Sequence, residues 1–109
     1  MNSSVSLEEL LEKARDLFSD KALQNSQRIL LLITLYMADR LIFTDLARVT
    51  GIDKGRLEYH LRVLEERGYI VRKRFITIAG PRLYIAITRE GREKVREVLR
   101  VLSSIAGKI

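Results

Sequence analysis

The sequence lacks cysteine altogether and has only one histidine among its 109 residues. Without cysteine, the chain can form neither disulfide bonds nor thiolate metal sites. The single histidine, His60, cannot make a typical zinc site without several carboxylate partners. A structural hydrogen bond or one phosphate contact is the expected role of His60. We therefore expect no metal ligands and no cofactor.

Long hydrophobic segments are also missing. The longest apolar run, Ile29 to Leu35, is interrupted by Thr34 and is far too short to span a bilayer. The N-terminal sequence MNSSVSLEELLEK carries acid where a signal peptide needs a basic region followed by an apolar core. We therefore expect a cytoplasmic protein without membrane contact. The length and the 47% apolar content predict a single domain, residues 1–109, with one hydrophobic core.

Acidic residues are absent from the long stretch between Glu66 and Glu90. The basic residues of this stretch contribute strongly to the net charge of +6. Residues 1–50 have six Lys/Arg and seven Asp/Glu, a net charge of −1, whereas residues 51–92 have ten and five, a net of +5. Between Glu66 and Glu90 there are six basic residues and no acid. Such clustering predicts a face that binds a polyanion. A solvated basic hairpin is the alternative interpretation.

Helical periodicity predicts two helices in the first third of the chain. The first runs from Leu7 to Phe18, and Ser6 with Glu9 forms a capping-box pattern at its start. The second begins at Ser26 and continues to about Ala38. Because this second helix is apolar almost all round, we expect it to be buried at the centre of the domain. The following residues, 41–43, are candidates for a short strand.

Two further helices are predicted around a glycine turn in residues 43–70, FTDLARVTGIDKGRLEYHLRVLEERGYI. Thr44 is the expected N-cap of a short helix from Asp45 to about Val49, with Leu46 and Val49 on one face. Gly51 can adopt the positive φ that ends this helix, and Ile52 is expected to plug the core. Asp53 is the expected cap of the next helix, which continues to about Arg67 before Gly68 stops it. This order is that of a helix-turn-helix.

The outer face of the fourth helix has the side chains that DNA recognition needs. Leu57, Leu61 and Leu64 share the inner arc, and the opposite arc holds Gly55, Tyr59, Arg62 and Glu66, flanked by Arg56 and Glu58. Arginine can bond guanine bidentately, glutamate can accept from cytosine, and tyrosine can contact phosphate or a thymine methyl. The alternative is that this is only the solvated side of an amphipathic helix.

A basic hairpin and a last helix complete the prediction. Strands are expected over residues 69–78 and 82–88, joined by a turn at 79–81, and Thr88 is expected to cap a helix from Arg89 to about Ala106. The hairpin also has an unusually apolar segment, comprising Phe75, Ile76, Ile78 and Ala79. We expect this segment to pack on the body or to contact a partner.

The stretch from about Ser26 to Gly91 resembles the winged helix-turn-helix of small prokaryotic regulators of the MarR, ArsR and PadR type. The resemblance is carried by LxxHLxxLEERGYI, residues 57–70, and by LYIAITREGRE, residues 83–93. It implies a mainly α fold with a small β-hairpin wing and extra terminal helices. The expected parts are an N-terminal helix region (1–24), a winged helix-turn-helix core (26–88) and a C-terminal dimerisation helix (89–109).

The resemblance further implies a homodimeric transcriptional regulator that binds double-stranded DNA. Its recognition helix, at about residues 53–67, would lie in the major groove, and its basic wing, at about residues 70–88, would lie on the DNA backbone or in the minor groove. Its expected DNA-binding residues are Lys54, Gly55, Arg56, Glu58, Tyr59, Arg62, Arg72, Lys73, Arg74 and Arg82. Its expected dimerisation residues are Leu7, Leu10, Leu11, Leu17, Val95, Val98, Leu99, Leu102 and Ile105, unless these stripes only pack on the chain's own core.

Two alternative functions would use the same predicted binding face. They are a non-specific architectural or chromatin protein and a winged-helix module that binds proteins. We expect no enzyme, because no catalytic constellation with sensible spacing is present. The sequence does not identify a small-molecule effector.

Overall fold

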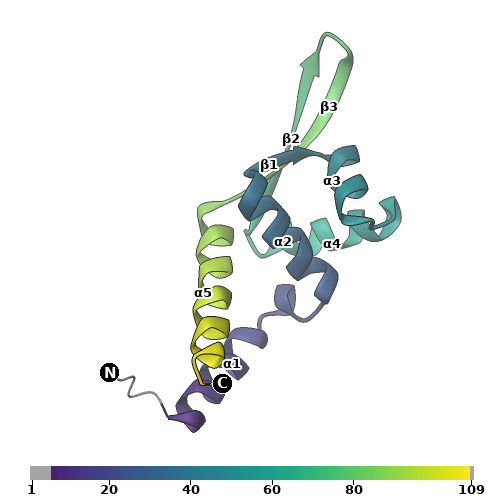
Figure 1. Ribbon diagram of the computed structural model, residues 1–109. Helices are drawn as coiled ribbons and strands as arrows, with labels where there is room; N and C mark the ends of the chain where they lie inside the picture. Colours follow the sequence, from purple (N-terminus) through teal and green to yellow (C-terminus); the bar gives the residue numbers. More distant parts are fainter. Residues whose placement is uncertain (1–5, 109) are drawn as a thin grey trace.

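The chain folds into a head that carries a projecting hairpin and a limb of two helices that extends the other way (Figure 1). The computed structural model describes residues 6–108, and the molecule measures 56 × 24 × 23 Å along its principal axes. In chain order the elements are α1 (Leu7–Phe18), the 3-10 turn η1 (Lys21–Leu23), α2 (Ser26–Ala38), β1 (Arg40–Ile42), α3 (Phe43–Thr50), α4 (Lys54–Glu66), β2 (Ile70–Thr77), β3 (Gly80–Ile87) and α5 (Arg89–Ala106). We call α1 and α5 the limb and α2 to β3 the head. Within the head, we call the β2–β3 hairpin the wing. The predicted fold class, mainly α with a β-hairpin wing, is confirmed.

Local capping fixes the ends of the helices where the sequence predicts them. The side chain of Ser6 accepts a hydrogen bond from the backbone of Glu9, and Glu9 returns one, which completes the capping box of α1. The Asp53 side chain accepts from the backbone of Arg56 at the start of α4. Gly51 and Gly68 both have positive φ, at 72° and 79°, where α3 and α4 end.

The prediction for α3 is wrong at its beginning. The helix starts at Phe43, two residues earlier than expected, and Thr44 lies inside it rather than capping it. Its N-cap is Ile42, whose hydrocarbon side chain cannot accept a capping hydrogen bond. The chain passes directly from β1, which is paired with β3, into the helix. Leu46 is fully buried as expected, but Val49 is half exposed, so the two do not share the core.

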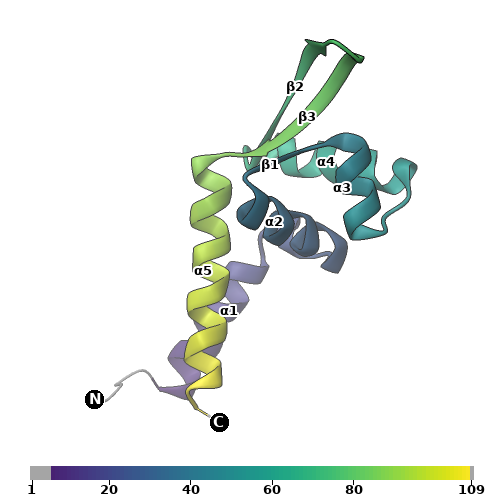
Figure 2. The same cartoon turned by 45° about the horizontal axis from the view of Figure 1, so that its top comes forward.

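The expectation that α2 is buried at the centre of the domain holds for one side of the helix only. Leu31, Leu32 and Leu35 are in the core, whereas Leu30, Ile33 and Met37 are exposed. The elements that contact α2 cover only part of its circumference, and the remaining apolar side faces outward. Figure 2 shows the same helix between α5 and the α3–α4 pair.

The sheet has the strand order β1-β3-β2 and is antiparallel throughout. The wing turn is Ile78-Ala79, not residues 79–81 as predicted, because Gly80 pairs with Thr77 and Pro81 pairs with Ile76. Gly80 makes this tighter turn feasible by adopting a φ of +109°. Thr77 closes it by donating a hydrogen bond of 2.6 Å from its Oγ1 to the carbonyl of Gly80.

The junction between the wing and the limb explains the TREG sequence at residues 88–91. Thr88 accepts from the backbone N–H of Gly91 and donates to the carbonyl of Gly68, so it caps α5 and ties it to the end of α4. A Cβ atom on Gly91 would lie 2.3 Å from the carbonyl oxygen of Tyr69. Only glycine therefore lets α5 pack this closely on the start of the wing.

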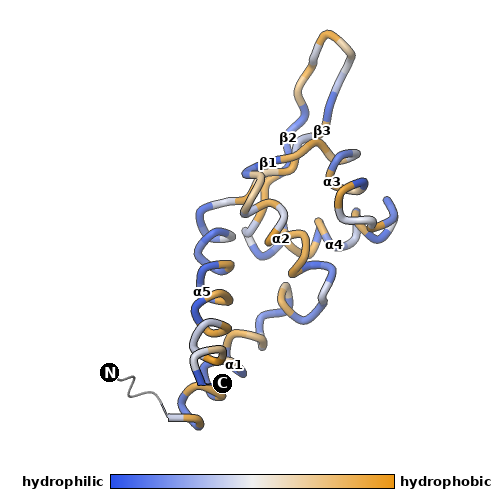
Figure 3. Tube along the Cα trace, in the orientation of Figure 1, coloured by the Kyte–Doolittle hydropathy of each residue, from blue (hydrophilic) through white to orange (hydrophobic). Residues whose placement is uncertain are grey.

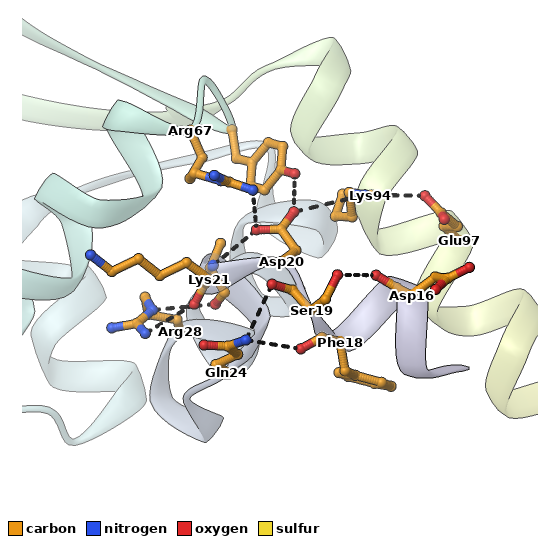
Figure 4. A network of polar contacts seen from close by, with 12 residues as sticks. Asp16, Phe18, Ser19, Asp20, Lys21, Gln24, Arg28, Arg67, Lys94 and Glu97 are labelled. Carbon is orange, nitrogen blue, oxygen red and sulfur yellow. Dashed lines mark hydrogen bonds and ion pairs between the residues drawn. The ribbon is translucent and has the colours of Figure 1, made fainter. Parts of the chain in front are cut away.

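Limb and head meet at a buried carboxylate, Asp20, which follows α1 (Figure 4). Its oxygens accept a hydrogen bond from the Tyr69 hydroxyl and an ion pair from Arg67 at 3.0 Å, and Lys94 of α5 lies 3.8 Å away. Burial alone would raise the pKa of Asp20, but the hydrogen bonds of Tyr69 and Ala22 and the two cations together lower it. Asp20 therefore stays ionised and joins three elements.

Candidate nucleic-acid interface

The outer face of α4 is open to solvent and carries the predicted recognition side chains. Leu57, Leu61 and Leu64 are fully buried, which confirms the predicted inner arc. On the other side Gly55, Tyr59 and Arg62 are exposed, and Arg62 makes no ion pair within residues 6–108. Lys54 and Arg56 are exposed at the N-terminal end of the helix, where the helix dipole also favours anions. The solvent-exposed side chains of this surface are thus mainly hydrogen-bond donors and cations.

A shallow hollow adjoins this face and includes residues that the sequence reasoning missed. It is lined by Gly55, Arg56, Tyr59 and His60 of α4 together with Asn25, Ser26 and Gln27 at the start of α2. The Asn25 side chain caps α2 by accepting from the backbone of Gln27 and Arg28. The Asn-Ser pair before the apolar run was the available signal, since asparagine is a strong N-cap.

His60 has the structural role that its isolation predicts. It is buried, and its Nδ1 lies 3.1 Å from Nη1 of Arg28 while its Nε2 lies 2.9 Å from Oε1 of Gln27. Because a guanidinium can only donate, Nδ1 must accept and Nε2 must carry the proton, so the ring is neutral. Burial, followed by the charges of Arg28 and Arg56, lowers the pKa of His60. The ring thereby fixes α4 against the start of α2.

Arg72 does not lie free for phosphate contact, contrary to the prediction. Its side chain is only 19% exposed, and its guanidinium forms ion pairs with Glu58 at 2.7 Å and with Glu65 at 2.8 Å. The hydrogen bond to Glu65 is the largest influence that raises the pKa of Arg72, although burial opposes it. Glu58 is likewise engaged rather than free to contact bases. The three residues clamp the base of the wing to α4.

The other predicted wing cations remain accessible. Lys73 and Arg74 are exposed next to each other on β2, so they point to opposite faces of the hairpin. Arg82 is partly buried because its Nη1 donates to the carbonyls of Pro81, at 3.0 Å, and Ala79, at 3.4 Å. Its charge is therefore held at the end of the wing.

The apolar segment of the wing does not pack on the body. Ile76 and Ile78 are almost completely exposed, and Phe75, in edge contact with Tyr84, is half exposed. In Figure 3 the far end of the hairpin is hydrophobic, whereas its lower part is hydrophilic. Of the two expectations for this segment, packing on the body is wrong, and contact with a partner stays a prediction.

The limb divides the predicted dimerisation residues into two groups. Leu10, Leu17, Val95 and Val98 are buried within the single chain, where α1 packs on α5, and Val101, which the prediction omitted, is buried with them. Leu7, Leu11, Leu99 and Leu102 are exposed, and Ile105 is partly buried. The alternative that the stripes pack on the chain's own core thus holds for the first group and for Ile105, which packs against the core.

Two other kinds of site are not found among the described residues. No cluster of three or more His, Asp or Glu side chains there could hold a metal ion. None of the described helices is both long and apolar enough to cross a membrane.

Because His60 is neutral in the fold, acid should weaken the fold. The unfolded chain binds a proton at His60 near pH 6.5, its ordinary pKa, whereas the folded chain does so only at lower pH. The free energy of unfolding should therefore fall as the pH drops from about 7.5 to about 5.5, by at most roughly 1.4 kcal/mol per pH unit. Chemical denaturation of the wild type and of His60→Gln measures this. The variant should show a flatter dependence, and parallel curves would contradict the assignment.

Comparison with known proteins agrees with this geometry. The family described as winged helix DNA-binding domain matches residues 27–106. The transcriptional regulator homologue from Pyrococcus horikoshii OT3 has a TM-score of 0.80 and 26% identity, over 89% of this chain and 96% of that one. MepR of Staphylococcus aureus, solved with DNA, has a TM-score of 0.71 and 20% identity, over 91% and 80%. NadR, solved with 4-hydroxyphenylacetate, has a TM-score of 0.70 and 21% identity, over 99% and 82%.

No protein with a curated description matches the chain. The family match covers more than two thirds of the residues and includes α2, the helix-turn-helix, the wing and α5. The winged helix-turn-helix that the motifs predict is confirmed by this match and by the shared fold. The chain belongs to the family of winged helix DNA-binding domains.

Proposed function

We propose that the protein is a sequence-specific transcriptional regulator that binds duplex DNA as a homodimer in the cytoplasm. One observation carries the proposal: the outer face of α4 presents Tyr59 and Arg62 to solvent, together with Arg56, whose ion pair at 3.5 Å is with Asp53 at the start of the same helix. A helix of this width fits the major groove, and the exposed tips are those that bond base edges and phosphates. The cations of the wing would then lie against the adjoining backbone.

The ion pairs that Arg72 forms with Glu58 and Glu65 support this arrangement, because they fix the angle between α4 and the wing. These two ion pairs join β2 to two points of α4, Glu58 and Glu65, that lie about two helical turns apart. A preorganised interface loses less conformational entropy on binding than a mobile one. Arg72 therefore contributes to DNA binding by positioning the wing rather than by contacting phosphate.

Dimerisation is proposed to use the exposed leucines of the limb. Leu7 and Leu11 are one helical turn apart on α1, and Leu99 and Leu102 are three residues apart on α5. Both pairs flank the buried α1–α5 seam, so together they can form one apolar strip along the limb. A two-fold axis through the limb would leave both recognition helices free for two half-sites.

Selection from a random-sequence duplex pool tests the regulator directly. The purified protein should enrich one site and bind it about 10³-fold or more tightly than mixed-sequence DNA. Tyr59→Phe together with Arg62→Ala should change the enriched sequence. Equal affinity for all duplexes would instead support the architectural alternative, and no DNA binding at about 50 mM salt would favour a protein-interaction module.

The salt dependence of binding should separate the free cations of the wing from the clamped one. Lys73→Gln with Arg74→Gln removes two phosphate contacts, so the slope of log K against log salt should flatten by roughly one per contact. Arg72→Gln, the matched control, should weaken binding while leaving the slope nearly unchanged. If Arg72→Gln flattened the slope as much per charge as the other substitutions, the positioning role would be wrong.

The oligomeric state should depend on the exposed limb leucines. Wild-type protein should sediment at twice the chain mass of 12.6 kDa, and Leu99→Glu with Leu102→Glu should sediment at 12.6 kDa because charges replace apolar contacts. Met37→Glu, which changes an exposed apolar residue of α2, is the control and should remain dimeric. A wild-type monomer, or a dimer that survives the double substitution, would contradict the proposed interface.

A further inference from the structure

The far end of the wing combines full exposure with an apolar surface. Ile76 is 91% exposed and Ile78 is completely exposed. No charged residue occurs between Arg74 and Arg82, where the sequence is FITIAGP. Since an exposed isoleucine gains free energy when it leaves water, such a projection is suited to insertion into another surface.

The shape of this tip is fixed before any partner arrives. The hydrogen bond from Thr77 closes the turn, and the guanidinium of Arg82 donates to the carbonyls of Ala79 and Pro81. The carbonyl groups of Ala79, Gly80 and Pro81 are therefore hydrogen-bonded, and a positive charge lies directly behind the tip. A braced turn can be pushed into a narrow space without first losing conformational entropy.

The charges next to the tip identify the partner. Lys73 and Arg74 of β2 precede the apolar segment and Arg82 of β3 follows it, so cations stand on both sides of the apolar tip. From Arg74 to Ile76 a strand advances by about 7 Å, close to the minor-groove depth of roughly 7.5 Å. Cations at the rim would contact phosphates while the isoleucines reached the base pairs.

We propose that Ile76 and Ile78 form an apolar wedge that enters the minor groove of duplex DNA and partly unstacks one base step. This inference rests on the proposed function, because it requires the head to be docked on DNA through α4. Apolar wedges of this kind kink the duplex toward the major groove. A kink in that direction bends the DNA toward the recognition helix and lets more of the head contact it.

The wedge adds a preference for DNA sequence that base contacts alone do not provide. Pyrimidine–purine steps unstack most readily, so a TA or CA step beneath the wing should be favoured. The wing of a second copy is a poorer partner for this tip. Two wings meeting end to end would bring Arg82 of each chain together and place their remaining cations nearby, which costs repulsion.

Bending of a dye-labelled duplex tests the wedge. The probe is a mixed-sequence duplex of about 30 base pairs with a donor and an acceptor on its two ends and TA steps along its length. Wild-type protein at about 50 mM salt should raise the energy transfer as it binds. Ile76→Ser with Ile78→Ser should bind roughly five- to tenfold more weakly and leave the energy transfer at saturation close to that of free DNA.

Two controls make the outcomes distinct. Met37→Ser removes an exposed apolar side chain from α2, away from the wing, and should bend the duplex like the wild type. Replacing every TA step by GC should reduce bending by the wild type and leave the double variant unchanged.

Equal bending by the wild type and the double variant would overturn the wedge while leaving DNA binding intact. A change in the oligomeric state of the double variant, measured by sedimentation, would also overturn it by showing that the tip contacts a second copy. Failure of the wild type to bind any duplex would overturn the proposed function and the wedge together.

Discussion

The relation between head and limb depends on one buried carboxylate. Asp20 lies between α1 and η1 and is bonded to Tyr69 and Arg67 at the α4–β2 junction, with Lys94 of α5 close by. Removing one partner of such a buried group leaves an uncompensated charge or dipole, which typically costs several kcal/mol. The fold therefore has one preferred angle between the limb and the head.

This fixed angle has a functional consequence for a two-fold assembly. If the limbs pair, the distance between the two recognition helices is set by α5, by the Asp20 network and by the Gly91 contact with Tyr69. A second clamp, Arg72 with two glutamates of α4, sets the angle of the wing. The helix α4, the wing and the limb are thus joined by a few polar contacts between otherwise apolar layers.

Local structure could be predicted from the sequence to within a residue or two, because caps and glycines act over short distances. Ser6, Asp53 and Thr88 each cap the helix that the sequence assigns to them. The sequence could not show which apolar side chains other elements would cover, or which charged side chains would form ion pairs with each other. Met37 follows an apolar pattern yet is exposed, and Arg72 looked like a phosphate ligand until the fold placed residues 7 and 14 positions away beside it. Both outcomes depend on tertiary contacts that no local pattern encodes.

We propose that DNA is bound by α4 and the wing while the limb stays free for the second copy. Amide chemical shifts of the labelled protein, recorded during titration with a duplex, distinguish this arrangement from binding through the limb. We expect the largest changes on residues 54–62 and 73–82, with the shifts of α1 and the second half of α5 nearly unchanged. Changes concentrated in the limb, with α4 and the wing unaffected, would contradict it.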